Sequence, residues 1–278
     1  MISNLRAHTI LRDFRTGSSQ PALVEASDGK KYVVKWKCTG DGPASPATDW
    51  IALRLAQIAG IPVPRAFCII VEEALGETTR DGELRDLIHR SAGVNLAIEY
   101  LPDARPFTAN DIHLLDEPLR NRIFLFDLLV LNIDRSDSNT NMLVSDGHVY
   151  LIDFSTSMEI KFRLTNTIVS EQALLARIRR HPFYGETAAI PSFHISGMQI
   201  TSIVESVPDG WYEDIGGGVS SIRKRAADGL HKLFTNSRSI WERRLKILAS
   251  ITPETREQID ARGMRNRRAF EAKLGKKL

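Results

Sequence analysis

The sequence predicts an α+β protein with a small β-rich part at residues 1–101 and a larger helical part at residues 102–278. Over the first hundred residues, short apolar stretches rich in β-forming residues alternate with turn residues, which is typical of strands. Farther along the chain, apolar residues recur at helical spacing. The length of 278 residues fits one large domain or two lobes.

Four segments of the first part predict strands: 21–24, 31–36, 67–71 and 95–100. The first two flank the turn residues 27–30 and therefore predict a hairpin. One helix is expected over residues 47–59, because Ile51, Leu55 and Ile58 share a face. Together these elements predict a small mixed sheet with one helix.

Five segments of the second part predict helices: 117–131, 171–180, 220–234, 237–250 and 253–274. Ser237 is expected to be the N-cap of the fourth helix. Trp241, Leu245 and Leu248 form one apolar stripe on that helix, which predicts a buried face.

The composition excludes several classes of protein. Two cysteines, Cys38 and Cys68, are too few for a disulfide scaffold or a thiol-bound structural zinc. No apolar run approaches the ~20 residues of a membrane span, and the charged N-terminus lacks the apolar core of a signal peptide. The sequence therefore predicts a soluble cytoplasmic protein.

The charge of the chain is concentrated at its C-terminal end. Residues 256–278 carry eight Lys or Arg against three Asp or Glu, whereas the whole chain has a net charge of +3. Such a tail is either a solvated helix or a contact for nucleic acid or an acidic partner. Phe270 is its only aromatic residue, so base stacking is poorly supplied and nucleic-acid binding is not expected.

The strongest indication of chemistry lies in residues 131–155. Asp134 and Asn139 are separated by four residues, and Asp153 follows within an apolar stretch. Phosphoryl transfer needs one acceptor that orients the attacking hydroxyl and oxygen ligands that hold Mg²⁺ against the phosphates. These three side chains supply both, whereas the alternative is an ordinary loop with Asx turns.

A predicted hairpin explains how these side chains meet. Asp146 and Gly147 form a strong turn signal between two apolar stretches. If Ser145 pairs with His148, Asp153 returns beside Asn139 and Asn141, within reach of one cation. The spacing leaves open which asparagine is the ligand.

Lys35 stands inside the apolar strand at residues 31–36, where an ammonium needs partners such as nucleotide phosphates. Lys37 shares its face and is the rival, and an edge-strand lysine that discourages aggregation is the structural alternative. Asp49 either pairs with Lys35 or caps its own helix. Asp127, inside an apolar helix, is expected to hold the following loop by hydrogen bonds.

These residues resemble the HipA-like kinases, specifically their shorter, single-module members. Four blocks carry the resemblance in matching order and spacing: 17–21, 32–35, 55–64 and 132–153. A looser likeness extends to residues 207–211. Arg135 follows Asp134, as in HipA-like and phosphatidylinositol kinases, whereas ordinary protein kinases place the arginine before the aspartate.

The resemblance implies a bilobal protein-kinase-like fold, with ATP and Mg²⁺ between a β-rich N-lobe and a helical C-lobe. It implies that Lys35 contacts the ATP phosphates, that Asp134 is the catalytic base, and that phosphate passes to protein serine or threonine, including a serine of the phosphate loop. The other implied positions are Gly17, Ser18 and Ser19 in that loop, Glu99, Tyr100 and Leu101 in the hinge, and the metal ligands Asn139 and Asp153, with Asn141 as the alternative ligand.

The sequence departs from this family in three ways. Ser155 stands where a glycine usually follows the Asp-aromatic pair, so the metal-binding turn is expected to differ. Asp49 stands where the family usually has Glu, so its pair with Lys35 is expected to be weaker or water-mediated. The extra N-terminal module of the longer HipA toxins has no counterpart, so a toxin role does not follow.

Two other functions remain open at the level of sequence. A lipid or small-molecule kinase is one, because phosphatidylinositol kinases share the Asp134–Arg135 pair and residues 152–154 resemble aminoglycoside-type kinases. A nucleotide-binding pseudokinase is the other, because of Ser155 and Asp49. The sequence identifies neither the phosphoryl acceptor nor an antitoxin-like partner.

Overall fold

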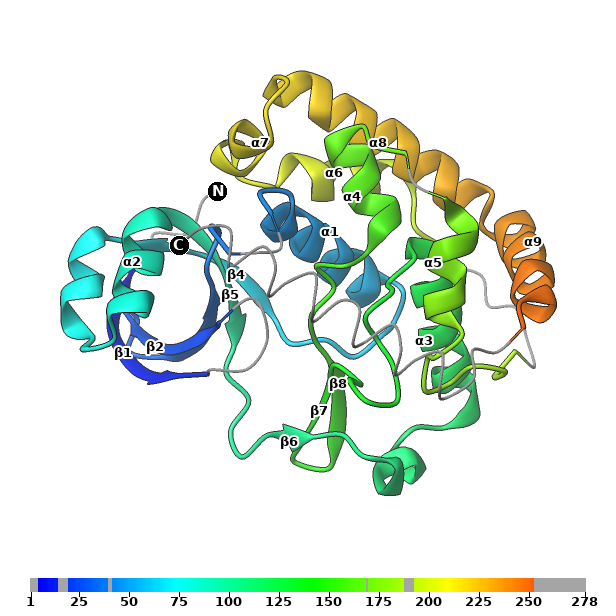
Figure 1. The fold of residues 1–278 in the computed structure, drawn as a ribbon, viewed down its shortest axis with the longest axis horizontal. Coiled ribbons are helices and arrows are strands. Elements are labelled where there is room, and N and C mark those ends of the chain that lie inside the picture. Colours follow the sequence, from blue (N-terminus) through cyan, green and yellow to red (C-terminus); the bar gives the residue numbers. More distant parts are fainter. Residues whose placement is uncertain (1–4, 15–19, 40–41, 169, 188–192, 253–278) are drawn as a thin grey trace, which may run out of the picture.

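The N-terminal part of the protein is a five-stranded sheet with the strand order β1-β2-β3-β5-β4 (Figure 1). The computed structural model describes residues 5–14, 20–39, 42–168, 170–187 and 193–252. The strands are β1 (Ala7–Asp13), β2 (Ala22–Ala26), β3 (Lys31–Lys35), β4 (Ala66–Val71) and β5 (Gly93–Glu99). All four ladders are antiparallel. A mixed sheet was expected, but the parallel pairing among the described residues is an isolated bridge between Arg6 and Ile70.

The hairpin of β2 and β3 forms around the predicted turn. Gly29 in this turn has a φ of +74°, which glycine adopts without steric strain. Because side chains alternate along a strand, Tyr32 and Val34 face one side of the sheet, and Val33 and Lys35 face the other. Tyr32 and Val34 are buried in the smaller of two hydrophobic cores. Lys35 is therefore directed away from that core.

The smaller core lies between the sheet and the segment that joins β4 to β5. This segment contains the 3-10 helix η1 (Glu73–Thr78) and helix α2 (Gly82–Arg90). Asp81 caps α2 by accepting hydrogen bonds from two backbone N–H groups of its first turn. Leu84, Leu87 and Ile88 are buried against the sheet. The sequence expectation of a single N-terminal helix is therefore wrong, because α2 is short and highly charged.

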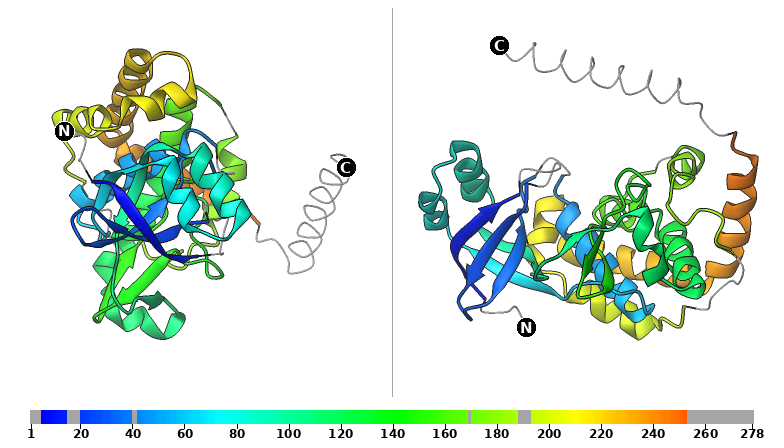
Figure 2. Two further views of the ribbon diagram at one scale, coloured as in Figure 1. Left: turned by 90° about the vertical axis from the view of Figure 1, so that its left-hand side faces the viewer. Right: turned by 90° about the horizontal axis from the view of Figure 1, so that it is seen from below.

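The C-terminal part is helical and holds the larger core. Its helices are η2 (Ala109–Leu114), α3 (Glu117–Val130), α4 (Met158–Thr165), α5 (Glu171–Ile178), α6 (Gly197–Glu205), α7 (Asp209–Ile215), α8 (Val219–Thr235) and α9 (Ser237–Ser250). Three short strands form a second sheet: β6 (Arg105–Pro106), β7 (Met142–Ser145) and β8 (His148–Leu151). The first sheet and α9 lie at opposite ends of the molecule (Figure 2).

Helix α1 (Ser45–Ile58) precedes the chain's crossing into the C-terminal part but belongs to the larger core. Ile51 and Leu55 are fully buried there, together with residues of α3, α4 and α6. Figure 1 shows α1 beneath α4 and α6. The helix that carries Asp49 is therefore held by the C-terminal helices.

Most of the predicted elements are present. The strands, the hairpin β7–β8 and the helix at 237–250 are confirmed. Ser237 as N-cap is wrong: the cap is Asn236, whose side chain makes no capping bond, because α8 runs almost directly into α9. The helix expected at 253–274 lies outside the described residues. Within the described part of the chain, no helix is both long enough and apolar enough for a membrane span.

We expect Arg244→Met to lower the free energy of unfolding by ~3 kcal/mol. Arg244 is 1% exposed, bonds Glu159 and Glu171, and donates to the carbonyls of Leu128 and Leu129 in α3 at 2.8 and 2.7 Å. Chemical denaturation measures the loss. In the matched control Arg238→Met, an exposed pair with Glu242 is removed and the change stays below ~0.5 kcal/mol. Equal losses in the two variants would contradict this account.

Candidate active site

A cleft of about 700 Å³ lies between the first sheet and the β7–β8 hairpin. Residues expected to form the site from sequence line this cleft together: Lys35, Glu99, Tyr100, Leu101, Asp134, Asn139, Asn141 and Asp153. They come from β3, the end of β5 and the segment after it, the loop before β7 and the turn after β8. The expected phosphate-loop residues Gly17, Ser18 and Ser19 lie outside the described residues.

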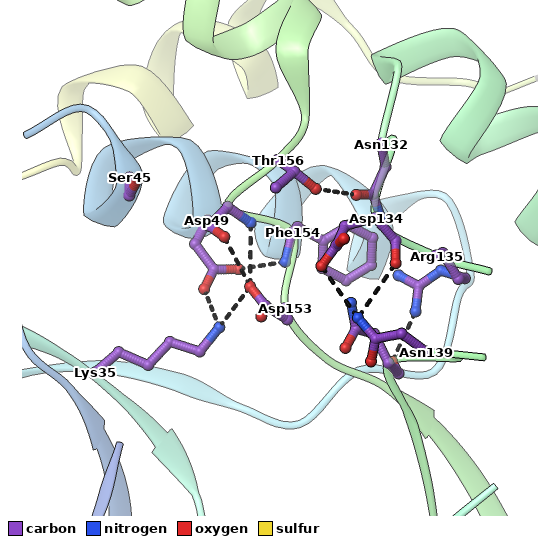
Figure 3. Close-up of polar contacts among 12 residues, drawn as sticks. Lys35, Ser45, Asp49, Asn132, Asp134, Arg135, Asn139, Asp153, Phe154 and Thr156 are labelled. Atoms are coloured by element: carbon purple, nitrogen blue, oxygen red, sulfur yellow. Dashed lines mark hydrogen bonds and ion pairs between the residues drawn. The ribbon is translucent and has the colours of Figure 1, made fainter. Parts of the chain in front are cut away.

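Lys35 bonds two carboxylates: Asp153, which lines the cleft, and Asp49, which is fully buried (Figure 3). Its Nζ donates to Asp49 Oδ2 at 2.6 Å and to Asp153 Oδ1 at 3.1 Å. Asp49 Oδ1 accepts a hydrogen bond from the backbone N–H of Phe154 at 2.9 Å. These three side chains, which we call the Lys35 triad, therefore connect β3, α1 and the turn after β8.

The charges of the triad do not balance, because one ammonium faces two carboxylates. Burial raises the pKa of Asp49, and Lys35 compensates only in part. Burial also acts to raise the pKa of Asp153, but the Lys35 charge and a hydrogen bond from Ser155 lower it to about 2. Burial acts to lower the pKa of Lys35, and the charges of Asp153 and Asp49 raise it instead. At neutral pH Lys35 is cationic and Asp153 is anionic.

The positions of Lys35 and Lys37 differ. Lys35 belongs to β3, which is paired on both sides, so it is not an edge-strand lysine. Lys37 lies beyond the end of β3, with its Nζ 3.7 Å from Asp214 Oδ2 in α7. Only Lys35 of the two lines the cleft.

The expected weak or water-mediated pair between Lys35 and Asp49 is wrong, because their contact is direct at 2.6 Å. The shorter aspartate reaches Lys35 because the larger core holds α1 close to β3, and because the Phe154 N–H fixes the other carboxylate oxygen. The helix-capping role is also wrong: α1 begins at Ser45, and its first turn contains no acidic residue.

Asp127 holds the loop after α3, as expected. Its carboxylate accepts hydrogen bonds from Arg135 Nε at 2.6 Å, Asn132 Nδ2 at 3.1 Å and His181 Nε2 at 3.1 Å. His181 Nδ1 accepts from the backbone N–H of Phe183, so the proton of the neutral imidazole lies on Nε2. The Asp127–Arg135 ion pair is fully buried.

Arg135 connects this loop to its surroundings. Its Nη1 donates to the carbonyls of Thr140 and Asn141 at 2.9 and 2.7 Å. Its guanidinium stacks over the Phe154 ring, 5.0 Å from the ring centroid. Arg135 therefore fixes both the residues that precede β7 and the aromatic residue next to Asp153.

Asp134 lies on this loop with an accessible carboxylate, 40% exposed. Asn139 Nδ2 donates to Asp134 Oδ2 at 3.1 Å, as Figure 3 shows. Arg177 of α5 approaches the other oxygen at 3.8 Å. Arg177 was not found by sequence reasoning, because nothing in the sequence distinguishes it from the neighbouring Arg179 and Arg180.

The β7–β8 hairpin has the predicted register. Ser145 pairs with His148, and the Ile152 N–H donates to the carbonyl of Asn141 at 2.9 Å. The hairpin therefore places Asn141 opposite the residue next to Asp153. Asp153 has a φ of +57°, whereas Ser155 lies outside the left-handed region. Ser155 Oγ donates to Asp153 Oδ1 at 2.8 Å, so the serine in place of glycine bonds the aspartate directly.

The oxygen atoms at this end of the cleft suit a hard cation. Asp153 is anionic, and the amide oxygens of Asn139 and Asn141 are donors that Mg²⁺ accepts. The buried Nδ2 of Asn141 has no hydrogen-bond partner within the described part of the chain. Rotating the amide so that its oxygen faces a cation would therefore break no hydrogen bond of Nδ2. No cluster of three His, Cys, Asp or Glu residues suited to a metal occurs among the described residues. A cation here would be held by Asp153, by the amide oxygens and by a bound ligand.

Apolar side chains form two opposite walls of the cleft. Leu23, Val33 and Ile98 come from the sheet, and Leu143 and Ile152 come from the hairpin. Such walls suit a flat ring between them. Sequence reasoning did not assign these residues to the site, although Val33 could have been found because it shares a strand face with Lys35.

His181 makes the stability depend on pH. Its pKa is lowered, mainly because burial disfavours the charged ring. The unfolded chain therefore binds a proton more readily than the folded chain, and the free energy of unfolding falls as pH drops below about 6.5. We expect His181→Gln to flatten this slope, which for one group is at most ~1.4 kcal/mol per pH unit. The exposed control His113→Gln keeps the slope; an unchanged slope in the His181 variant would contradict the prediction.

Comparison with known proteins agrees with the sequence motifs. A model of the HipA-like kinase family matches residues 7–243. No match was found among curated proteins. Among solved structures, the crystal structure of a Helicobacter pylori proinflammatory kinase, CtkA, is 12% identical, with a TM-score of 0.46 over 90% of this chain and 100% of that chain. Because the family match spans most of the sequence, the chain belongs to the HipA-like kinase family.

Proposed function

We propose that the protein is an ATP-dependent kinase that transfers the γ-phosphate to a protein serine or threonine with the help of Mg²⁺. One observation supports this proposal above all: a single cleft brings together Lys35, Asp134, Asn139, Asn141 and Asp153. These residues supply a cation for phosphates, a carboxylate for the acceptor hydroxyl and oxygen ligands for a metal ion. The family match supports kinase chemistry in general.

Each proposed role follows from the position of the side chain. Lys35 binds the ATP phosphates, since its ammonium lies in the cleft and its orientation is fixed by Asp49. Asp134 orients the acceptor hydroxyl and accepts its proton, since its carboxylate is accessible and held by Asn139. The residues of the hinge, Glu99 to Leu101, border the apolar walls that would enclose the adenine ring.

Asp153 and one or both of the asparagines would hold Mg²⁺. When bound, the ion neutralises charge that develops on the phosphates during transfer. Asp153 is suited to this role because its lowered pKa keeps it anionic at neutral pH. Ser155 and Lys35 hold the same oxygen of Asp153, which orients the carboxylate before a ligand arrives.

The proposed acceptor class rests on the family resemblance. Within this proposal, Ser18 and Ser19 are candidate acceptors in the chain itself. A phosphate on either serine would add about −2 charge where the ATP phosphates must bind, so autophosphorylation would inhibit the kinase.

We expect the purified chain to gain phosphate when incubated with Mg²⁺ and ATP, measured as an increase in intact mass. Asp134→Ala and Asp153→Ala are expected to slow the gain at least ~100-fold, because they remove the proposed base and a metal ligand. Asp146→Asn, a change in the β7–β8 turn, is the control and should behave as the wild type, because asparagine tolerates the φ of +49° at this position.

Two outcomes would count against this prediction. Equal phosphate gain in the Asp134→Ala variant would exclude Asp134 as the base. No gain with any protein acceptor, together with ATP protection against thermal unfolding, would favour a small-molecule or lipid kinase or a pseudokinase.

A magnesium titration separates the two asparagines. We expect alanine at the asparagine that binds the metal to raise the Mg²⁺ concentration at half-maximal rate by ~10-fold or more, because one oxygen ligand is lost. The other variant serves as the matched control, since both change an amide at the same end of the cleft. An unchanged Mg²⁺ requirement in both variants would show that neither amide binds the ion.

A further inference from the structure

We infer that Trp211 is a positioning residue: its indole connects the two lobes on the side away from the hinge and holds the Lys35 triad in place. Trp211 lies in α7 and is 1% exposed. The surrounding residues 207–211 are part of the looser family resemblance, and the proposed catalytic roles do not use them. The inference rests on the proposed function for its effect on catalysis.

The first contact of Trp211 crosses between the lobes. Its indole Nε1 donates to the backbone carbonyl of Val94 in β5 at 2.7 Å. Leu96, two residues farther along β5, pairs with Lys35 of β3. The hydrogen bond therefore holds β5, the strand whose Leu96 pairs with Lys35 of β3. Lys37 and Asp214, 3.7 Å apart, add a second contact between the sheet and α7.

The second contact of Trp211 reaches α1. The rings of Trp211 and Trp50 meet edge to face, with centroids 6.2 Å apart. Trp50 Nε1 donates to Ser206 Oγ, directly after α6, at 2.9 Å. Trp50 follows Asp49 in the chain. Its contacts with Trp211 and Ser206 therefore hold the residue next to the carboxylate that bonds Lys35.

These contacts add to the apolar packing by which Cys68 and Leu96 of the sheet join the larger core. Trp50, Val94, Ser206 and Trp211 border a cavity of about 810 Å³ on this side of the molecule. Figure 1 shows α7 on one side of the junction between the lobes and the chain from β5 to β6 on the other. Trp211 thus adds a non-covalent connection between the lobes to the covalent hinge and to the contacts of Lys35 with Asp49 and Asp153, and it limits their opening. The same contacts keep α1 from moving away from Lys35.

The chain offers a matched control for a test. Trp241 in α9 is also 1% exposed, and its Nε1 donates to the carbonyl of Leu125 at the same distance, 2.7 Å. Both partners of that bond lie within the larger core. Trp211→Phe and Trp241→Phe therefore remove the same kind of hydrogen bond, but only the first removes it between lobes.

The experiment compares both variants by hydrogen–deuterium exchange and by the rate of phosphate gain, after thermal unfolding has measured their losses of stability. We expect Trp211→Phe to speed exchange in α1 and β5 about tenfold and to lower kcat by a similar factor, the equivalent of ~1.4 kcal/mol. Trp241→Phe should leave exchange in α1 and β5, and kcat, within about twofold of the wild type. In an Asp49→Asn background, Trp211→Phe should lower kcat no further.

Several results would overturn the inference. Unchanged exchange in α1 and β5 would show that Trp211 does not hold these elements. Equal effects of the two variants on kcat would reduce its role to general stability, and full additivity with Asp49→Asn would remove the connection to the triad. If the wild type transfers no phosphate, the proposed function fails, and the exchange measurement still decides whether Trp211 holds the lobes together.

Discussion

The contact between Lys35 and Asp49 is the constraint on which the rest of the site depends. It joins a strand of the sheet to a helix of the larger core, and Asp49 extends the connection to the Phe154 N–H beside Asp153. Three elements that are distant in sequence thus meet at one buried carboxylate. Removing a partner of such a buried pair typically costs ~3–5 kcal/mol, because a charge is left without compensation. The position of α1, and not the length of the acidic side chain, makes the contact direct.

A second buried pair, Asp127 with Arg135, does the same for the loop that carries Asp134. Arg135 also bonds the carbonyls before β7 and stacks on Phe154, so the two networks meet at that phenylalanine. A buried ion pair contributes little to net stability when compared with apolar packing, since desolvation offsets the attraction. Its contribution here is geometric: it holds the loop in one arrangement, with the Asp134 carboxylate directed to the cleft.

Much of the fold and of the candidate site could be predicted from local patterns. The turn at Asp146 and Gly147 determined the register that brings Asn141 beside Ile152. The alternation of side chains along β3 directs Lys35 away from the smaller core. Strand β1 was missed because irregularities in its pairing with β2 interrupt the alternation of its side chains, and α2 was missed because its apolar stripe is short. The direct Lys35–Asp49 contact and the bridge from Trp211 to Val94 depend on packing between distant segments, which one sequence does not encode locally. The roles proposed for Asn139 and Asn141 remain predictions.

The most direct test of the central claim is a crystal structure with a non-hydrolysable ATP analogue and Mn²⁺, whose anomalous scattering locates the metal ion. The account predicts a Mn²⁺ peak that contacts Asp153 and at least one of Asn139 and Asn141, with Lys35 on the phosphates and the terminal phosphate facing Asp134. A nucleotide bound outside the cleft of Lys35 and Asp153, or a metal ion that contacts none of these three ligands, would contradict it.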